Sequence, residues 1–230
     1  MKTIGLLGGM SWESTAAYYR IVNEEVQRRR GGLHSARCVV YSLDFAEVEE
    51  CQRTGDWLRA EQILAEGARR LVAAGAELLL ICSNTMHKLA EQIESDLPVP
   101  LLHIADATAQ EALRRRIHCV GLLGTRFTME EDFYRARLER HGLRVLVPPA
   151  PEREWVDGMI FGELVRGRFS RSSRQELLAV VAHLADRGAQ GVILGCTELG
   201  LLVQQRHTTV PLLDTTELHA RAAVERALRD

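Results

Sequence analysis

The side chain best suited to proton chemistry in this chain is Cys196, which follows a short apolar run between glycines. The length of the run Val192–Leu194 and its flanking glycines favour a buried parallel strand over a helix. A free thiol has a pKa of about 8.5, close to working pH, and a nearby helix N-terminus can lower it. Gly195 allows a sharp turn and close approach of the backbone. Because ligands of open α/β sheets bind at the carboxyl ends of strands, Cys196 is predicted to lie at a ligand site, the alternative being an inert buried thiol.

A second segment repeats this pattern 113 residues earlier, with Ser83 at the position of Cys196 (196 − 83). Cys82 precedes Ser83, and strand alternation predicts that the Cys82 side chain points to the opposite face. Three pairs of similar segments recur in the same order at offsets of 113, 116 and 111: 75–83 with 188–196, 4–8 with 120–124, and 99–102 with 210–213. This repetition indicates a duplicated half-domain, in which two equivalent strand ends are able to face each other across a cleft.

Short apolar strands alternate with amphipathic helices along the chain, which predicts an α/β fold with parallel sheets in two similar lobes. The expected strands are 3–7, 36–43, the run before Ser83, 118–123, 144–147, 192–194 and 210–213. The expected helices are one ending near 30, then 56–74, 85–96, within 125–141, 152–166, 171–187, a short one ending near 205, and one from 217. We assign residues 1–115 to an N-terminal lobe and 116–230 to a C-terminal lobe, and the last helix is a candidate to cross back and pack on the first lobe.

Three further features have a structural and a functional interpretation. The turn at Gly8-Gly9 is either a plain βα loop or a backbone cradle for a carboxylate, since glycines and a helix N-terminus expose N–H groups. The segment 44–55, which carries Gln52, reads by default as a loop and short helix with a solvated face. His87 stands alone in the first turn after Ser83, and for a lone histidine a structural role is favoured over catalysis.

Composition excludes several classes of function. The net charge of −2 leaves no broad basic face, so nucleic acid is not expected as a partner. No run approaches the roughly 18 apolar residues of a membrane span, and the N-terminus shows no signal-peptide pattern. Five cysteines without CxxC spacing fit a reducing cytoplasm and argue against a zinc site. No metal-ligand cluster and no cofactor motif is recognised, so neither a metal nor a cofactor is predicted.

The motifs together resemble the aspartate/glutamate racemase family over essentially the whole chain. The matching segments are Gly8-Gly9-Met10, Cys82-Ser83-Asn84-Thr85 and Gly195-Cys196-Thr197-Glu198. Three more segments resemble the broad-specificity amino acid racemase branch: Glu50-Cys51-Gln52-Arg53, Asn84-Thr85-Met86-His87-Lys88 and His103-Ile104-Ala105-Asp106-Ala107-Thr108. The resemblance implies two Rossmann-like lobes, an active site in the cleft between them, no cofactor and a homodimer.

Racemisation removes the α-proton from one face of a carbon and returns a proton to the other, so a symmetric pair of acid/base groups suits it. Cys196 and Ser83 are the predicted catalytic pair. Members of the family typically carry cysteine where this chain has Ser83, although the resembling branch carries a threonine there. With water as a stand-in for serine, a hydroxyl is about 7 pKa units weaker than a thiol, or about 10 kcal/mol. Serine at position 83 is therefore expected to affect the rate of catalysis more than the type of reaction.

Polar residues around the pair are predicted to bind an amino acid. Neutral hydrogen bonds to an α-carboxylate can come from four residues, Asn84, Thr85, Thr125 and Thr197, helped by helix N-termini. Gln52 can contact a polar side chain of the substrate, and Met10 can form an apolar wall. Strict aspartate racemases present a lysine near the position of Val165, and the nearest cation here is Arg166, so strict aspartate specificity is disfavoured.

Two other functions remain open from the sequence. A decarboxylase or isomerase of the same fold could use Cys196 alone, with hydroxyl groups such as Ser83 lining an oxyanion site. A degenerate racemase could act as an amino-acid-binding or regulatory protein, although the retained thiol and polar residues argue against it. A racemase would exchange the α-proton of an amino acid, and a decarboxylase would release CO₂ from a malonate-type acid. A binding protein would do neither.

Overall fold

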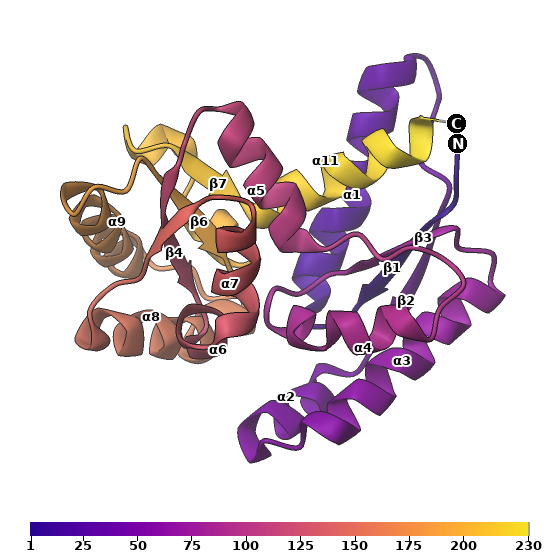
Figure 1. The fold of residues 1–230 in the computed structure, drawn as a ribbon, viewed down its shortest axis with the longest axis horizontal. Coiled ribbons are helices and arrows are strands. Elements are labelled where there is room, and N and C mark those ends of the chain that lie inside the picture. The colour runs from indigo at the N-terminus through magenta and orange to yellow at the C-terminus, as the bar shows by residue number, and fades with distance from the viewer. Residues whose placement is uncertain (230) are drawn as a thin grey trace. The chain divides into compact units, whose positions relative to one another are not determined.

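The computed structural model describes residues 1–229 and confirms an α/β fold with two parallel sheets (Figure 1). By its internal contacts the chain divides into two compact units. Unit 1 contains Met1–Ile104 and the C-terminal segment that begins at His219, and unit 2 contains Ala105–Leu218. The domain boundary expected between residues 115 and 116 stays a prediction.

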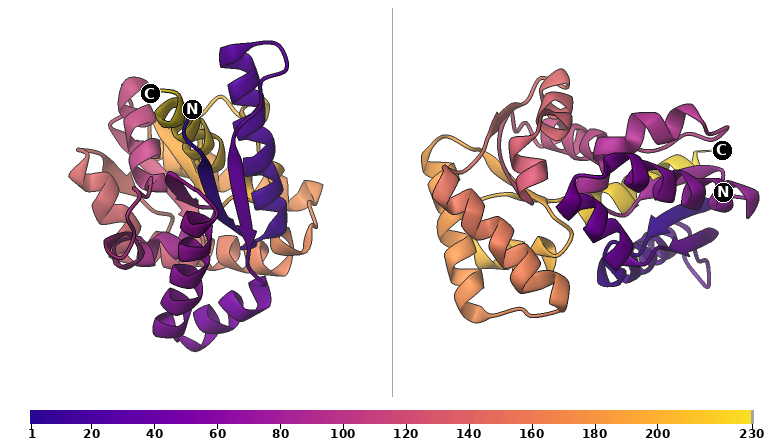
Figure 2. Two further views of the ribbon diagram at one scale, coloured as in Figure 1. Left: turned by 90° about the vertical axis from the view of Figure 1, so that its right-hand side faces the viewer. Right: turned by 90° about the horizontal axis from the view of Figure 1, so that it is seen from below.

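Unit 1 is built on a three-stranded parallel sheet in the order β2-β1-β3. Its elements are β1 (Ile4–Gly8), α1 (Trp12–Arg30), β2 (Cys38–Ser42), α2 (Phe45–Thr54), α3 (Trp57–Ala73), β3 (Leu78–Ile81), the 3₁₀ helix η1 (Thr85–Leu89), α4 (Ala90–Ser95) and most of α11 (Thr215–Leu228). The two ends of the described chain lie side by side, and the Lys2 N–H donates a hydrogen bond to the Ala227 carbonyl over 2.9 Å (Figure 2).

Alternation along the strands of unit 1 separates two apolar clusters, one on each face of the sheet. Leu7, Leu79 and Ile81 pack with α2, α3 and α4 on one face. Leu6 and Leu80 pack with α1 and α11 on the other. Because both faces are covered, the strands read as continuous apolar runs, as parallel strands usually do.

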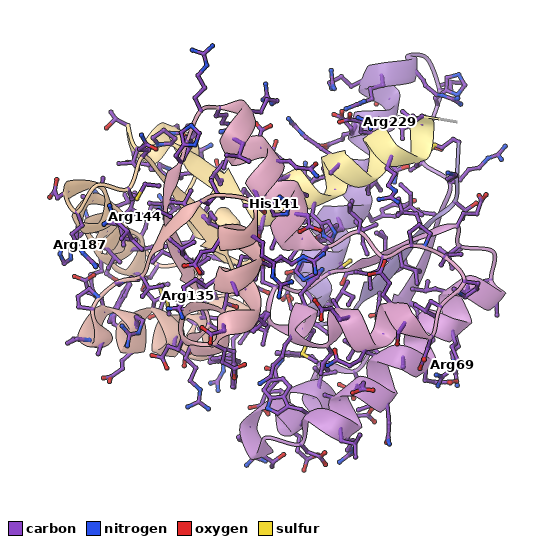
Figure 3. All side chains as sticks on the ribbon, viewed as in Figure 1. Arg69, Arg135, His141, Arg144, Arg187 and Arg229 are labelled. Atoms are coloured by element: carbon purple, nitrogen blue, oxygen red, sulfur yellow. The ribbon has the colours of Figure 1, made fainter. Side chains whose placement is uncertain are left out.

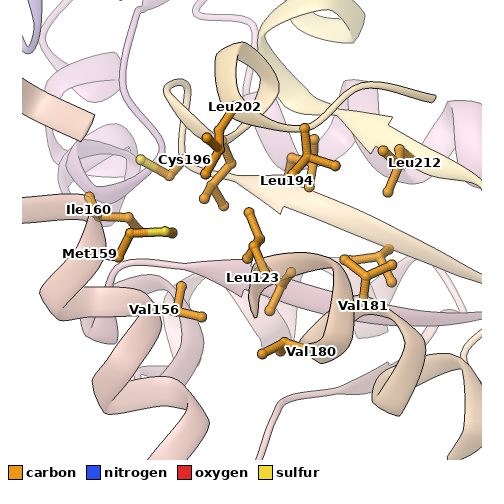
Figure 4. Packing of buried hydrophobic residues seen from close by; sticks show 14 of the residues in the cluster. Leu123, Val156, Met159, Ile160, Val180, Val181, Leu194, Cys196, Leu202 and Leu212 are labelled. Carbon is orange, nitrogen blue, oxygen red and sulfur yellow. The ribbon is translucent and has the colours of Figure 1, made fainter. Parts of the chain in front are cut away.

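Unit 2 is built on a four-stranded parallel sheet in the order β5-β4-β6-β7. Its elements are most of α5 (Ile104–Arg114), then β4 (Cys119–Gly124), α6 (Arg126–Glu130), α7 (Asp132–Arg140), β5 (Arg144–Leu146), α8 (Ala150–Gly162), η2 (Leu164–Arg166), α9 (Arg171–Asp186), β6 (Gly191–Gly195), α10 (Leu199–Leu202), η3 (Gln205–His207) and β7 (Leu212–Asp214). On one face of this sheet the helices α8, α9 and α10 bury the largest apolar cluster, which reaches from Leu212 to Cys196 (Figure 4).

The register of the two sheets confirms the internal repeat. In unit 1 Leu7 pairs with Ile81, and in unit 2 Leu123 pairs with Leu194. These residues differ by the offsets found in the sequence, 116 (123 − 7) and 113 (194 − 81), and the three preceding pairs of each ladder match in the same way. The single bridge between Leu79 and Leu101 in unit 1 stands where β7 pairs with β6 in unit 2. Residues at equivalent positions of the repeat therefore occupy equivalent positions in the two sheets.

Several helix boundaries differ from those that the sequence predicts. The helix expected over 85–96 is a 3₁₀ turn followed by the short helix α4. The segment 125–141 holds two helices, because Glu131 adopts an extended conformation that ends α6 and begins α7. The expected helix 152–166 ends at Gly162 and is followed by η2, and α5 is a helix that was not among those expected from the sequence. Apolar periodicity continues across such breaks, so it cannot locate a change at one residue.

The turn after β1 requires glycine at position 9. Gly9 has φ of +90°, and a Cβ there would overlap the backbone carbonyl and amide of Leu43. We expect Gly9→Ala to lower the free energy of unfolding by about 2–4 kcal/mol, since strain and backbone overlap add. Gly75→Ala is the matched control: its φ is +93° with open space around the Cβ, so about 1–2 kcal/mol is expected. Equal losses for both variants in urea denaturation would contradict this reading.

Charged side chains on the surface mainly pair within their own helices. Arg69 and Arg229, labelled in Figure 3, form ion pairs with Glu66 and Glu225 on α3 and on the end of α11. Exposed pairs of this kind contribute little to stability, roughly 0–1 kcal/mol each. In residues 1–229 no helix is both long and apolar enough to cross a membrane.

Candidate functional site

In unit 1 the candidate residue Ser83 lies just beyond the carboxyl end of β3. The Cys82 N–H donates to the Leu7 carbonyl over 2.9 Å, which extends the alignment with β1 by one residue before the chain turns. The Ser83 side chain is buried, with 7% of the residue exposed. Its Oγ accepts a hydrogen bond from the Met86 N–H at 3.5 Å, at the start of η1. The hydroxyl oxygen thus has a backbone donor beside it, which favours negative charge on that oxygen.

Two other candidate residues of unit 1 are linked to Met86, which follows Ser83 in the chain. The Gln52 side-chain amide donates to the Met86 sulfur over 3.1 Å, and Met10 belongs to the same apolar cluster as Met86. Gln52 is buried with its neighbour Cys51, so the default interpretation of this segment as a solvated face is wrong for these two residues. Met10, Gln52, Ser83, Asn84 and Thr85 are all less than 8% exposed.

In unit 2 Cys196 and Thr125 emerge from neighbouring strands at the same level. Gly124 of β4 pairs with Gly195 of β6, and the two candidate residues follow these glycines directly. A Cβ on Gly195 would lie 2.6 Å from the Leu123 carbonyl oxygen, so the close approach of the strands requires glycine here. Cys196, Thr125 and the next residue, Thr197, are all buried.

Figure 4 shows Cys196 beyond Leu194 at the edge of the apolar cluster, near Met159 and Ile160 of α8. The Cys196 side chain therefore has apolar neighbours on the side of this cluster. Such surroundings disfavour an isolated thiolate, because burial removes the water that would solvate the charge.

The carboxylate of Glu198 is the direct polar partner of Cys196. The Cys196 Sγ donates to Glu198 Oε2 over 2.9 Å, and the Thr197 hydroxyl donates to the same oxygen over 2.7 Å. Glu198 is only 3% exposed. Glu198 belongs to one of the family-like segments but is not among the site residues predicted from the sequence. An acidic residue two positions after a candidate thiol is the signal that could have identified it.

The pKa of the Cys196 thiol is raised well above its ordinary value. Burial is the main cause, and the charge and hydrogen bond of Glu198 raise it further. The backbone N–H groups of Glu198 and Leu199 act in the opposite direction and do not outweigh these effects. The neighbouring N–H groups therefore lower this pKa as expected, but burial and Glu198 outweigh them and the net shift is upward. In the resting protein Cys196 is a thiol whose proton faces a carboxylate.

Replacing Glu198 by glutamine separates its charge from its capacity to accept a proton. In Glu198→Gln the thiol loses a negative neighbour, so we expect the pKa of Cys196 to fall. We nevertheless expect turnover to fall by about 10²-fold, because the amide cannot take the thiol proton. Alkylation rates against pH, corrected with Cys196→Ala, give the pKa, and α-proton exchange gives turnover. A lower pKa accompanied by faster turnover would show that Glu198 only holds the thiol protonated.

Cys82 lies apart from the Ser83 group, as strand alternation predicts. It is fully buried among Leu78 and Leu80 in the cluster that packs against α1 and α11. Burial raises the pKa of the Cys82 thiol far above its ordinary value. Its location in the apolar core on that face makes Cys82 a structural residue.

The segment that bears on substrate choice is η2 at the end of α8. Val165 packs against the apolar cluster of unit 2, and Arg166 is exposed to solvent. The structure thus shows an apolar contact for Val165, near the position where the resemblance predicts a lysine in strict aspartate racemases. Arg166 is not among the buried residues of this unit.

The Gly8-Gly9 turn is less open to a ligand than a bare glycine loop. The Gly9 N–H donates to the Thr15 hydroxyl over 2.8 Å, and Ser11 caps α1 by accepting from the Ser14 N–H. Two of the N–H groups expected to cradle a carboxylate are therefore already bonded within the turn. Within residues 1–229 no cluster of three or more His, Cys, Asp or Glu side chains could hold a metal ion.

The sequence and the fold of this chain are similar to those of known racemases. The model of the Asp/Glu/hydantoin racemases matches residues 7–223. A crystal structure from Yersinia pestis, described as a candidate Asp/Glu racemase, is 50% identical and covers 100% of both chains with a TM-score of 0.92. An aspartate racemase homologue from Pyrococcus horikoshii is 36% identical, with 99% of both chains covered and a TM-score of 0.84.

A broad-specificity amino-acid racemase of Bacillus subtilis is 24% identical over 227 residues, which is 96% of each chain. A glutamate racemase of Syntrophus aciditrophicus is 29% identical over 218 residues, covering 85% of this chain and 76% of that protein. The family match spans both units and both strand ends that carry Ser83 and Cys196. The chain is therefore a racemase and belongs to the Asp/Glu/hydantoin racemase family.

Proposed function

We propose that this enzyme racemises amino acids without a cofactor, with Cys196 acting on one face of the α-carbon and Ser83 on the other. The observation that carries the proposal is the matched register of the two sheets, which sets these residues at equivalent strand ends. The thiol bonded to the Glu198 carboxylate supports it, because a carboxylate within hydrogen-bond distance can take a proton from the thiol.

The proton transfers balance as follows. The Cys196 thiol gives its proton to Glu198, and the thiolate removes the α-proton and becomes a thiol again. The carbanion takes a proton from the Ser83 hydroxyl on its other face. Water reprotonates Ser83, and the hydroxide that remains takes the proton held by Glu198. In the reverse direction the same transfers run backwards: the deprotonated Ser83 oxygen takes the α-proton, and the Cys196 thiol, which its raised pKa keeps protonated, gives its proton to the carbanion and recovers one from Glu198.

The substrate we propose is a polar, uncharged amino acid rather than aspartate, with broad acceptance. Val165 offers no charge to a side-chain carboxylate, while the Gln52 amide is a hydrogen-bonding group beside the Ser83 turn. Binding of the α-carboxylate is proposed for Asn84, Thr85, Thr125 and Thr197, and an apolar wall for Met10. These are neutral contacts, so they do not depend on a charged side chain of the substrate.

A panel of L-amino acids in deuterated water tests both the activity and this preference. We expect α-deuterium uptake and formation of the other enantiomer, with saturation at lower concentration for homoserine, serine or glutamine than for aspartate. Val165→Lys should improve kcat/KM for aspartate by about tenfold, because a cation near a side-chain carboxylate is worth on the order of 1 kcal/mol. Tighter saturation by aspartate in the unmodified enzyme would contradict the preference.

A single-cysteine decarboxylase is the second candidate, favoured by the one observation that, of the equivalent positions 83 and 196, one carries a hydroxyl and the other a thiol. It predicts CO₂ release from a malonate-type acid and no α-proton exchange with amino acids. A homodimer and a cytoplasmic location are further proposals, and both rest on the family resemblance and on cysteine usage. An amino-acid-binding protein would show neither exchange nor CO₂ release.

A further inference from the structure

Three histidines of unit 1, which we call the histidine cluster, are buried beside one another: His87, His103 and His219. They are 3%, 5% and 0% exposed. The ring centroids of His87 and His103 are 4.5 Å apart, and those of His87 and His219 are 5.6 Å apart. His87 is therefore not the lone histidine that the sequence suggested, and its ring is held from two sides.

Both nitrogens of the His87 ring bond to the main chain. Nδ1 lies 2.6 Å from the Ser83 carbonyl oxygen, and the Ile104 N–H donates to Nε2 over 3.1 Å. A carbonyl can only accept, so Nδ1 carries the proton; an amide N–H can only donate, so Nε2 does not. These two partners select the neutral Nδ1–H tautomer, and protonation of the ring would break the bond from Ile104.

The partners of His87 belong to two functionally different segments. Ser83 carries the hydroxyl that we propose as the second acid/base group. Ile104 is the last residue of unit 1 before the chain passes into unit 2. One imidazole ring therefore ties the Ser83 peptide to the segment through which the chain leaves the unit.

His219 holds the same outgoing segment from another side. Its Nε2 donates to the Leu102 carbonyl over 2.7 Å, and the Tyr18 hydroxyl donates to its Nδ1 over 2.8 Å. His219 is also the first residue of unit 1 after the chain returns from unit 2. The segment 102–104 thus has a fixed place against which His87 can hold the Ser83 turn.

We propose that His87 is a positioning residue for Ser83, acting through the Ser83 carbonyl and not on the substrate. This rests on the proposed catalytic role of Ser83. The hydrogen bond fixes the orientation of the peptide group between Ser83 and Asn84. This orientation sets the direction in which the Ser83 hydroxyl points. A displacement of about 1 Å at a reacting group can slow a reaction about 10²-fold.

Two substitutions remove the two hydrogen bonds of the His87 ring one at a time. In His87→Asn the side-chain NH₂ takes the place of Nδ1–H and can still donate to Ser83, but nothing reaches Ile104. In His87→Gln the amide oxygen takes the place of Nε2 and can still accept from Ile104. Each variant loses one bond, so similar losses of urea midpoint are expected. We expect kcat to fall 10- to 100-fold in His87→Gln and less than about threefold in His87→Asn, with KM little changed.

The matched control is His219→Gln, in which the side-chain amide takes the place of Nε2 and can still donate to Leu102, so the segment 102–104 keeps its hydrogen bond while the ring and its bond to Tyr18 are lost. It should lower the urea midpoint and leave kcat within about twofold of the parent enzyme. Equal losses of kcat in His87→Asn and His87→Gln, in step with their stability, would overturn the proposal and leave His87 a structural residue. ¹⁵N NMR of histidine in the unmodified enzyme is a second measurement, and an His87 ring found protonated or as the Nε2–H tautomer at working pH also overturns it.

If the proposed catalytic role of Ser83 is wrong, the variants are expected to give a different result from the one that overturns the role of His87. If Ser83→Ala racemises as fast as the parent enzyme, Ser83 is not an acid/base group, whatever the His87 variants do. If Ser83→Ala is inactive in racemisation but still exchanges protons, adding His87→Gln to it should cause no further loss of exchange. A further loss there would show that His87 acts on the other face, which also contradicts its role through Ser83.

Discussion

Cys196→Ala is expected to lower α-proton exchange by about 10³-fold or more while the protein stays folded. General acid–base groups contribute about 10²–10⁴-fold, and no second thiol is available at this strand end. Cys196 lies at the edge of the apolar cluster and not at its centre, so the loss of one sulfur atom leaves most of the packing in place (Figure 4). Initial rates of α-deuterium uptake from both enantiomers measure the effect.

Cys82→Ala is the matched control for this substitution. Cys82 is the other buried cysteine next to a strand end, but it packs in the core between the sheet and α1 and α11. We expect Cys82→Ala to cost about 1–2 kcal/mol of stability and to leave exchange within about twofold. Exchange lost with Cys82→Ala and kept with Cys196→Ala would reverse the assignment of the two thiols.

Ser83→Ala is expected to abolish racemisation and to leave α-proton exchange with retention from one enantiomer. The Cys196 face needs only its own base, so it can remove and return a proton without Ser83. The equilibrium constant between enantiomers is one, so in the parent enzyme any difference in kcat between directions must be matched in KM. Uptake of deuterium measured separately from each enantiomer shows which face has been lost.

Ser83→Cys is the restoring variant for the same site. A thiol is a stronger acid than a hydroxyl by about 7 pKa units, so the slower proton transfer should speed up by about tenfold or more if the larger sulfur is accommodated. The disulfide that two thiols could form is excluded by measuring under reducing conditions. Identical exchange from both enantiomers in Ser83→Ala would show that Ser83 is a substrate contact, and the decarboxylase candidate would gain support.

The side-chain pattern of each strand could be read from local sequence. Alternation assigned Cys82 and Ser83 to opposite faces of the sheet, and the structure buries Cys82 with Leu78 and Leu80. The glycines that end β1 and β4 marked the turns, and the Asp56 cap of α3 is observed, with its carboxylate accepting from the Arg59 N–H. Such features depend on residues within a few positions of one another, which is why they are visible without a fold.

Features that join distant segments could not be read in this way. The contact of Gln52 with Met86 and the bond from Ile104 to His87 link residues 34 and 17 positions apart. The charged and polar residues around Gln52 also predict a solvated face by default, whereas burial of a polar side chain depends on what packs above it. Helix breaks such as the one at Glu131 depend on a single backbone conformation that apolar spacing does not encode.

By itself the sequence determined the parallel α/β architecture, the internal repeat and the equivalence of Ser83 with Cys196, because runs of apolar residues, glycines and offsets are local or periodic signals. Only the tertiary structure decided the protonation state of Cys196. The pKa of that thiol is set by burial and by the Glu198 carboxylate 2.9 Å away, against two backbone N–H groups. These opposing effects depend on how closely atoms approach and how far water is excluded, and both are fixed when the helices pack on the sheet.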